Sequence, residues 1–309
     1  MIRIVQCSGS TVGGDNRRLI RVFPRRTKAT PTDALARFGP PGLFDEADEV
    51  HVSVTFTWDK PKAERLAEQW QSVAPVKVGG VAYGDTSLEF IPGRYIKPGY
   101  TITSRGCPRR CWFCGVWKKW PQPNPMPIYP GWNVLDDNLL ACPEWHVRAV
   151  FDMLKQQTQR VEFTGGLEAA ALQDYQVDLL ASLKPRPSMF WAYDPGDPLE
   201  TLEYAATRML AAGWTRESHR LRCYVLIGYP RDTFAEAEKR LTDMVRIGFT
   251  PMAMLWRPET EAAMKWEPAS EWRAFQRRWV RPAIIHAHSG EQSNRHAMNS
   301  VLRAYAEAT

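Results

Sequence analysis

The strongest constraint on the fold is an alternation of strand-like and helix-like segments that begins at Tyr100. Short apolar runs are typical of buried strands, whereas apolar residues spaced three and four apart are typical of helices with one buried face. The expected strands are Tyr100–Ser104, Arg160–Thr164, Ser188–Tyr193, Leu221–Ile227, Pro251–Trp256 and, with a weaker pattern, Ala283–His286; the expected helices are Pro143–Gln157, Ala169–Leu183, Pro198–Ala212 and Thr233–Ile247. This order predicts a parallel sheet, open or curled into a partial barrel, with ligands at the carboxyl ends of its strands.

The ends of two expected helices carry residues that favour these boundaries. Gly213 and Gly248 stand where a left-handed residue commonly ends a helix. Thr233 precedes the fourth helix and is followed three residues later by Glu236, a pattern typical of a capping box.

The first 95 residues predict a separate, smaller α/β domain. Strand-like runs are Ile2–Val5, Leu19–Phe23, Val50–Trp58 and Val76–Val81, and a helix is expected at Lys60–Val73 with Ala63, Leu66, Ala67 and Trp70 on one face. The segment 27–44, rich in proline and glycine, is expected to be a loop. The predicted organisation is therefore an N-terminal domain at 1–95, a partial barrel at 96–260 and a C-terminal helical extension at 261–309.

Composition and the absence of long apolar runs set the expected compartment. Of the 309 residues, 44% are hydrophobic, which is enough for a sizeable core. No apolar run approaches the roughly 18 residues of a membrane span, and the first residues do not resemble a signal peptide. We therefore expect a cytoplasmic protein with no membrane partner, in which cysteines stay reduced and serve as ligands or catalysts.

Three of the six cysteines lie within eight residues, in the run Cys107-Pro-Arg-Arg-Cys111-Trp-Phe-Cys114. This run directly follows the strand expected at Tyr100–Ser104, where a ligand site is expected. A zinc site needs a fourth ligand, and no second pair of closely spaced cysteines or histidines follows. Three thiolates suit a [4Fe–4S] cluster in which one iron stays open to a small molecule.

The spacing of these cysteines resembles the C-x₃-C-x-aromatic-C signature of the radical S-adenosylmethionine (radical SAM) superfamily. The resemblance covers roughly residues 100–257 and implies an α/β fold with a partial (β/α)₆ barrel. It implies that Cys107, Cys111 and Cys114 hold the cluster, that SAM binds the fourth iron, and that Phe113 lies beside the adenine. A low-potential electron donor of the flavodoxin or ferredoxin type would then drive cleavage of SAM to methionine and a 5′-deoxyadenosyl radical, which takes a hydrogen atom from the substrate.

Other segments are similar to SAM-binding parts of this family, with departures. Thr164-Gly165-Gly166 resembles its Gly-Gly-Glu motif, although Leu167 stands at the acidic position and Glu168 follows it. The run 228–233 resembles a Gly-x-Pro-Gly-Asp/Glu-Thr turn, with Arg231 in place of the second glycine. The resemblance assigns cofactor binding to Phe113, Thr164, Gly165, Gly166, Glu168, Tyr193, Asp194, Arg222 (or Arg220), Gly228 and Leu255. Ordinary structural roles, such as a glycine turn or a surface arginine, remain the alternative for each of them.

Residues 1–95 look like the degenerate Rossmann-like domain that precedes the barrel in cobalamin-dependent and methylthio-transferring relatives. The Asp-x-His-x-x-Gly loop of the cobalamin group is absent, so no cobalamin is expected. A second cluster would require Cys142 and Cys223 to converge with Cys7, whereas buried, inert thiols are the simpler interpretation. His286 and His288 could bind a metal, but no third ligand is evident.

Basic residues are concentrated where acids are missing. Residues 90–135 contain no Asp or Glu, and the first 30 residues contain one acid among several arginines. The acid-free stretch carries Arg94, Lys97, Arg105, Arg109, Arg110, Lys118 and Lys119, interleaved with Trp112, Trp117, Trp120 and Trp132. Such a mixture suits phosphate contacts beside stacking on bases, although a solvated basic surface would look the same.

The favoured hypothesis is a radical SAM isomerase or transferase that modifies a base of DNA or RNA, with Lys118 and Lys119 contacting the substrate. One alternative is a radical SAM enzyme acting on a peptide or a small metabolite. An alternative of another class is a nucleic-acid-binding protein that carries a cluster without turnover.

Overall fold

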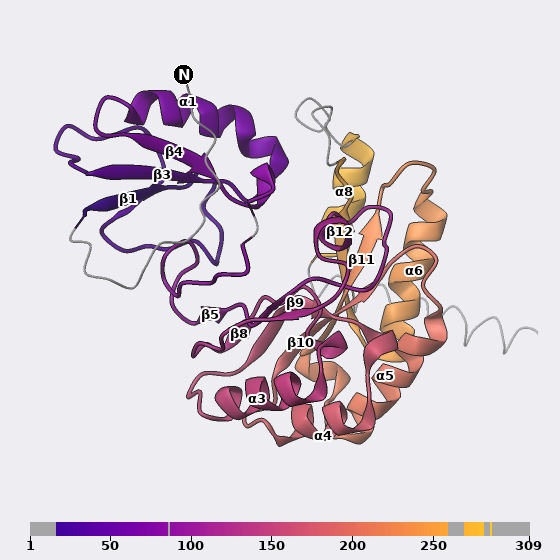
Figure 1. Ribbon diagram of the computed structural model, residues 1–309. Coiled ribbons are helices and arrows are strands. Elements are labelled where there is room, and N and C mark those ends of the chain that lie inside the picture. The colour runs from indigo at the N-terminus through magenta and orange to yellow at the C-terminus, as the bar shows by residue number, and fades with distance from the viewer. Residues whose placement is uncertain (1–16, 86, 259–268, 281–284, 286–309) are drawn as a thin grey trace, which may run out of the picture. The chain divides into compact units, whose positions relative to one another are not determined.

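The computed structural model describes residues 17–85, 87–258, 269–280 and 285, drawn in colour in Figure 1. Two compact units are distinguished: one runs to residue 157 and includes Pro258, and the other comprises residues 158–257 and the described residues after 268. The strand expected at Ile2–Val5 and nearly all of the one at Ala283–His286 fall outside the described residues. No helix in the described part of the chain is long and apolar enough to span a bilayer.

The first unit contains a four-stranded parallel sheet with the order β2-β1-β3-β4. Its strands are β1 (Leu19–Val22), β2 (Ala36–Arg37), β3 (Glu49–Ser53) and β4 (Val76–Gly79), and the helix α1 (Lys60–Trp70) covers one face (Figure 1). As predicted, Ala63, Leu66, Ala67 and Trp70 are buried, and they join a cluster with the apolar residues of β1 and β3. The expected α/β region is thereby confirmed.

Three details of this unit differ from the expectation. The strand predicted at Val50–Trp58 ends at Ser53, because a 3₁₀ turn, η1 (Thr57–Asp59), leads directly into α1. The segment 27–44 is not entirely loop, since it contributes the two-residue strand β2. A second 3₁₀ turn, η2 (Val81–Tyr83), follows β4 at Gly80, whose φ is +105° and where a Cβ would lie 2.6 Å from the Val54 carbonyl oxygen.

The second sheet has six strands in the order β12-β11-β10-β9-β8-β5, which is the reverse of chain order throughout. They are β5 (Tyr100–Thr101), β8 (Asn133–Val134), β9 (Glu162–Leu167), β10 (Ser188–Tyr193), β11 (Leu221–Ile227) and β12 (Thr250–Leu255). The registered pairs β5–β8, β9–β10, β10–β11 and β11–β12 are all parallel. This confirms an α/β fold built on parallel strands; β5 and β12 are the two edges of the sheet.

Helices alternate with these strands as predicted. They are α3 (Glu144–Lys155), α4 (Asp174–Ser182), α5 (Leu199–Ala211) and α6 (Phe234–Ile247), followed by α8 (Ser270–Arg278). Figure 1 shows α4, α5 and α6 alongside strands β9–β12. Thr233 caps α6, because its Oγ1 accepts from the Glu236 amide at 3.2 Å. Gly213 and Gly248 follow α5 and α6 with φ of 95° and 114°, so both predicted C-terminal glycines are confirmed.

Short elements account for the differences in this sheet. The strand expected at Tyr100–Ser104 is divided into β5 and β6 (Ser104–Arg105), and β6 pairs antiparallel with β7 (Asn124–Pro125). The helix expected at Ala169–Leu183 begins as a 3₁₀ turn, η4 (Ala169–Ala171), and restarts after a Gln173–Gln176 capping box. Strand β8 was not predicted, because two residues are too few to form a pattern.

Candidate cysteine-loop site

Three consecutive polar residues that follow β8 hold the segment leading into the cysteine loop. The first, Asp136, is buried, and its carboxylate accepts hydrogen bonds from the Thr103 amide (2.6 Å), the Thr103 hydroxyl (2.6 Å) and the Ser104 hydroxyl (2.7 Å). Burial raises the pKa of Asp136, while the hydrogen bonds from Thr103 oppose that shift. His146 of α3 also contacts this segment, with its Nε2 3.3 Å from Thr103 Oγ1. Burial lowers the pKa of His146.

The next two polar residues continue this arrangement. Asp137 accepts from the Gly106 amide at 2.8 Å and pairs with Arg105 at 3.3 Å. Gly106 has φ of +105°, and a Cβ there would lie 2.1 Å from the Gln122 carbonyl oxygen, so only glycine fits. Asn138 donates from Nδ2 to Cys107 Sγ at 3.3 Å. The backbone from Thr103 to Cys107 is thus fixed by one short polar segment.

The cysteine loop itself is irregular and is tied at both ends. The Cys107 amide donates to the Trp120 carbonyl at 3.1 Å. The Cys111 carbonyl accepts from the Cys114 amide (3.1 Å) and from the Trp117 indole (2.9 Å), which belongs to the short helix α2 (Val116–Lys119). All three cysteines are thiols at intermediate exposure.

The fit of these residues to an iron–sulfur cluster rests on their donor set. Within the described residues, no three His, Cys, Asp or Glu side chains are gathered closely enough to hold a metal ion. The set still suits a [4Fe–4S] cluster, because three accessible thiols share one irregular loop and an amide donor already contacts one sulfur. Phe113 is placed beside them, edge-on to the half-exposed Trp112 with ring centroids 5.4 Å apart.

Two of the other cysteines have the character of inert core thiols. Cys142 and Cys223 are buried, and burial raises the pKa of Cys142 to about 11 and that of Cys223 well above its ordinary value. A neutral, buried thiol is a poor metal ligand and nucleophile. Cys7, His286 and His288 lie outside the described residues.

The glycine pair lies within β9, whereas a turn at the end of the strand was expected. Between Met189 and Trp191 of β10 the register with β9 shifts, so the stretch containing Gly165 and Gly166 bulges. Gly166 has φ of +103°, and a Cβ built on it would meet no atom within 4 Å. The Thr164 carbonyl accepts from the Tyr224 hydroxyl at 3.3 Å. The bulge therefore presents open backbone, which is the property a bound ligand needs.

Leu167 and Glu168 stand where the sequence departs from the resembled Gly-Gly-Glu motif. Leu167 is 2% exposed and belongs to the core of the second unit, so an acid at this position would be buried. Glu168 begins the turn η4 and is partly exposed.

The turn after β11 is held by a buried ion pair. Asp232, whose side chain is fully buried, accepts from the Gly228 amide at 2.7 Å and from Arg240 at 2.8 and 2.9 Å. Arg240 also donates to the Leu226 carbonyl at 3.2 Å. Arg231 adopts φ of 73°, the left-handed region that favours glycine, at the position where the resembled motif has glycine.

The structure brings Gly228 and Leu255 together at the carboxyl ends of β11 and β12. A Cβ at Gly228 would lie 2.7 Å from Leu255 Cδ1 and 3.2 Å from the Trp272 ring of α8. Trp272 itself packs with Phe234 and Phe275. Helix α8 therefore covers this part of the strand ends, which sequence patterns did not indicate.

The remaining predicted cofactor residues occupy different parts of the second sheet. Tyr193 ends β10 and is buried, which raises its pKa, and the Asp194 amide donates to Asp197 at 3.0 Å. Arg222 is the second residue of β11 and donates to the His219 carbonyl at 2.9 Å. At about 3.3 Å per residue, it lies roughly 16 Å from the carboxyl end of that strand. Arg222 is thus not placed with Gly228 and Leu255.

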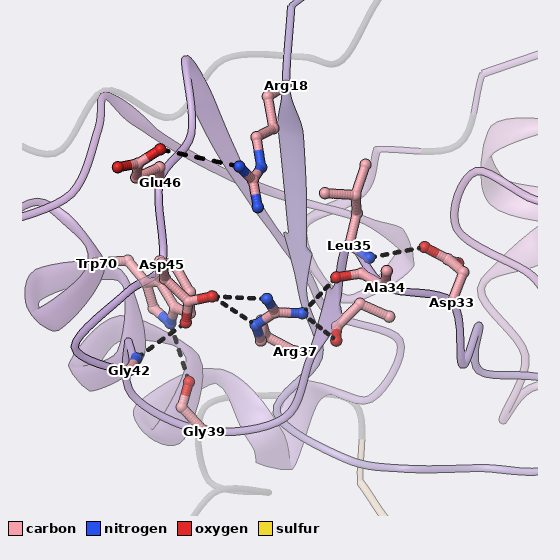
Figure 2. A network of polar contacts seen from close by, with 11 residues as sticks. Arg18, Asp33, Ala34, Leu35, Arg37, Gly39, Gly42, Asp45, Glu46 and Trp70 are labelled. Carbon is pink, nitrogen blue, oxygen red and sulfur yellow. Dashed lines mark hydrogen bonds and ion pairs between the residues drawn. The ribbon is translucent and has the colours of Figure 1, made fainter.

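The N-terminal arginines, expected to add to a basic surface, are largely engaged by acids of their own unit. Arg37 binds Asp45 through both Nε (2.9 Å) and Nη2 (2.6 Å), in the network shown in Figure 2. In the same network Asp45 accepts from the Gly42 amide, and Arg18 pairs with Glu46 at 3.9 Å. Further pairs are Arg21–Asp33 and Arg25–Asp59. These ion pairs hold loops of the first unit to its sheet and partly neutralise the arginines that form them.

Lys118 and Lys119 are exposed cations next to the cysteine loop, as is Arg110 within it. Both lie on α2 and are exposed, beside the half-exposed Trp112. Lys119 donates to the Gly84 carbonyl at 2.7 Å and lies 5.9 Å from the centroid of the Trp120 ring.

Sequence patterns did not identify Asp136, Asp137 and Asn138. One signal was available: the stretch without acids ends at this Asp-Asp-Asn run, directly after a short strand. Consecutive polar residues at the carboxyl end of a parallel strand mark a ligand site in many α/β folds.

Replacing Arg231 by glycine is expected to raise the free energy of unfolding by up to about 1 kcal/mol. A left-handed residue other than glycine costs about 1–2 kcal/mol, which exceeds the ~0.5–1 kcal/mol that glycine loses through the freedom of the unfolded chain. Urea unfolding of both proteins measures the difference. A less stable Arg231→Gly variant would mean that the arginine side chain stabilises the turn by more than the strain it imposes.

Comparison with models of protein families finds none that matches this chain, and a search of curated proteins finds no match either.

Proposed function

We propose that this chain is a radical SAM enzyme whose [4Fe–4S] cluster is held by Cys107, Cys111 and Cys114. The observation that carries the proposal is the position of the C-x₃-C-x-Phe-C loop, which follows the first of six strands arranged in chain order in one sheet. Under this proposal the six-stranded sheet is the partial (β/α)₆ barrel, and residues 1–95 form the Rossmann-like domain before it.

The cluster, when bound, supplies the electron that splits SAM into methionine and a 5′-deoxyadenosyl radical. The chain's own residues have separate tasks. Asp136, Asp137 and Asn138 hold the strand end and the first cysteine in place. The open backbone at Gly166 leaves room for the amino acid part of SAM, and Phe113 offers an aromatic face for the adenine.

We propose a nucleic-acid base as the site of hydrogen abstraction. Support comes from the exposed Lys118 and Lys119 and from the exposed ring of Trp112, which together offer phosphate contacts and a stacking surface. Because Arg18, Arg21 and Arg25 pair with acids of their own unit, the contact surface is proposed around the cysteine loop and α2.

The test of this function is anaerobic incubation of the reconstituted protein with SAM, a reductant and DNA, RNA or peptide. Mass spectrometry then follows both 5′-deoxyadenosine and the substrate. The proposal predicts deoxyadenosine formation and a changed nucleobase. Deoxyadenosine with a changed peptide or metabolite would retain the radical chemistry and replace the substrate, whereas a stable cluster without deoxyadenosine would favour a binding protein without turnover.

The double variant Lys118→Ala/Lys119→Ala is expected to bind nucleic acid with a weaker dependence on salt. Each phosphate contact contributes about 0.7–0.9 to the slope of log affinity against log salt, so losing two contacts lowers the slope by up to about 1.4–1.8. Fluorescence anisotropy at several salt concentrations measures it. The matched control removes two exposed lysines that form helix ion pairs, Lys155 and Lys239. Equal slopes for the double variant and the control would argue against α2 as the contact surface.

A further inference from the structure

We infer that Asn138 sets the reduction potential of the cluster through its hydrogen bond to Cys107 Sγ, an inference that rests on the proposed function. The bond joins Asn138 Nδ2 and the sulfur at 3.3 Å, a normal length for an amide donor and a sulfur acceptor. Asn138 is 3% exposed, so water does not compete strongly for this donor.

The backbone around Asn138 keeps the donor in position. Asn138 is the N-terminal capping residue of the turn η3 (Leu139–Ala141), and its carbonyl accepts from the buried Cys142 thiol at 3.7 Å. The two residues before it, Asp136 and Asp137, bind the strand end that leads to Cys107. Both partners of the bond therefore stand on backbone held by the same short polar segment.

The direction of the effect follows from charge. Reducing an iron–sulfur cluster places more negative charge on its sulfur ligands, and an N–H group pointing at a sulfur stabilises that charge. The bond from Asn138 therefore favours the reduced cluster and raises its potential. The Cys114 amide and the Trp117 indole both donate to the Cys111 carbonyl oxygen, so these two donors do not point at a sulfur.

The test is a potentiometric titration of the reconstituted full chain, followed by the electron paramagnetic resonance signal of the reduced cluster. Asn138→Leu keeps a side chain of similar size and removes the donor. We expect this variant to retain its iron and to have a more negative midpoint potential than wild type, while Asn138→Gln, which keeps an amide, recovers part of the shift.

Asn124→Leu is the matched control, because Asn124 lies in the same region but donates to the carbonyls of Arg105 and Gln122. Its midpoint potential should equal that of wild type. If Asn138→Leu loses its iron, Asn138→Ala, which also removes the donor and adds no charge, takes its place in the titration.

Equal potentials for wild type and Asn138→Leu would overturn the inference, as would loss of iron from both Asn138→Leu and Asn138→Ala, which would make Asn138 purely structural. Failure of the proposed function is seen separately, in wild-type protein that binds no cluster or that holds a cluster without forming 5′-deoxyadenosine from SAM.

Discussion

Replacing Arg240 by leucine is expected to lower the free energy of unfolding by about 3–5 kcal/mol. The change leaves the Asp232 carboxylate fully buried without its cation and removes a donor from the Leu226 carbonyl. The lost bonds hold the turn between β11 and α6. Because Asp232 also accepts from the Gly228 amide, the change should loosen the end of β11 as well. Guanidinium unfolding monitored by tryptophan fluorescence measures the loss.

The matched control is Lys239→Ala, which removes the neighbouring cation on the same helix. Lys239 is exposed and pairs with Asp243 one turn away, so its loss should cost under about 0.5 kcal/mol. The double variant Asp232→Asn/Arg240→Leu should be less destabilised than the sum of its single changes. Equal and small effects at Arg240 and Lys239 would contradict the assignment of the buried pair as the anchor of this turn.

Replacing Cys107, Cys111 and Cys114 together by alanine is expected to abolish binding of about four irons per chain. Stability of the unloaded protein should change little, because the three thiols are partly exposed and leave no large cavity. Iron assay and visible absorption after anaerobic reconstitution measure the first effect, and urea unfolding measures the second.

The control for this change is Cys142→Ala/Cys223→Ala, which removes two buried thiols. This variant should lose stability through the space it leaves, yet bind as much iron as wild type. Iron retained by the triple variant, or lost by the control alone, would place the cluster on other cysteines.

Apolar patterns predicted the long elements of this fold well. The strands at Ser188–Tyr193 and Leu221–Ile227 are found at the predicted residues, because each is a continuous run long enough to show a period. On β11 alternate side chains are buried, which is the signature of a strand covered on one face. Helix α1 was equally predictable from the sequence, since its four buried residues repeat at helical spacing.

Short elements and side-chain partners were not predictable from one sequence. Strand β8 has two residues and no period, yet it carries the polar run that binds the segment before Cys107. The pairing of Arg37 with Asp45 depends on a loop returning to β2, which composition does not reveal. The same holds for Arg21 and Arg25, two arginines of the basic first 30 residues, which pair with Asp33 and Asp59.

The predicted site residues also differ in how far a local sequence pattern could place them. The cysteine spacing is a local pattern and needs no tertiary information. The left-handed φ of Arg231 was not predicted, although this residue occupies a glycine position of the resembled turn motif. The residues that were assigned only by their place along a strand do not all lie together in the structure. Gly228 and Leu255 are neighbours, whereas Arg222 stands at the other end of β11 from them.

A SAM-binding cluster on Cys107, Cys111 and Cys114 is tested most directly by the electron paramagnetic resonance spectrum of the reduced, reconstituted protein, recorded with and without SAM. A cluster with one open iron that SAM occupies should give the signal of a reduced [4Fe–4S] centre, about four irons per chain, and a change in that signal when SAM is added. Both features should be absent from the triple cysteine variant. Stoichiometric zinc without iron, or a cluster signal that SAM leaves unchanged, would contradict the assignment of Cys107, Cys111 and Cys114 to radical SAM chemistry.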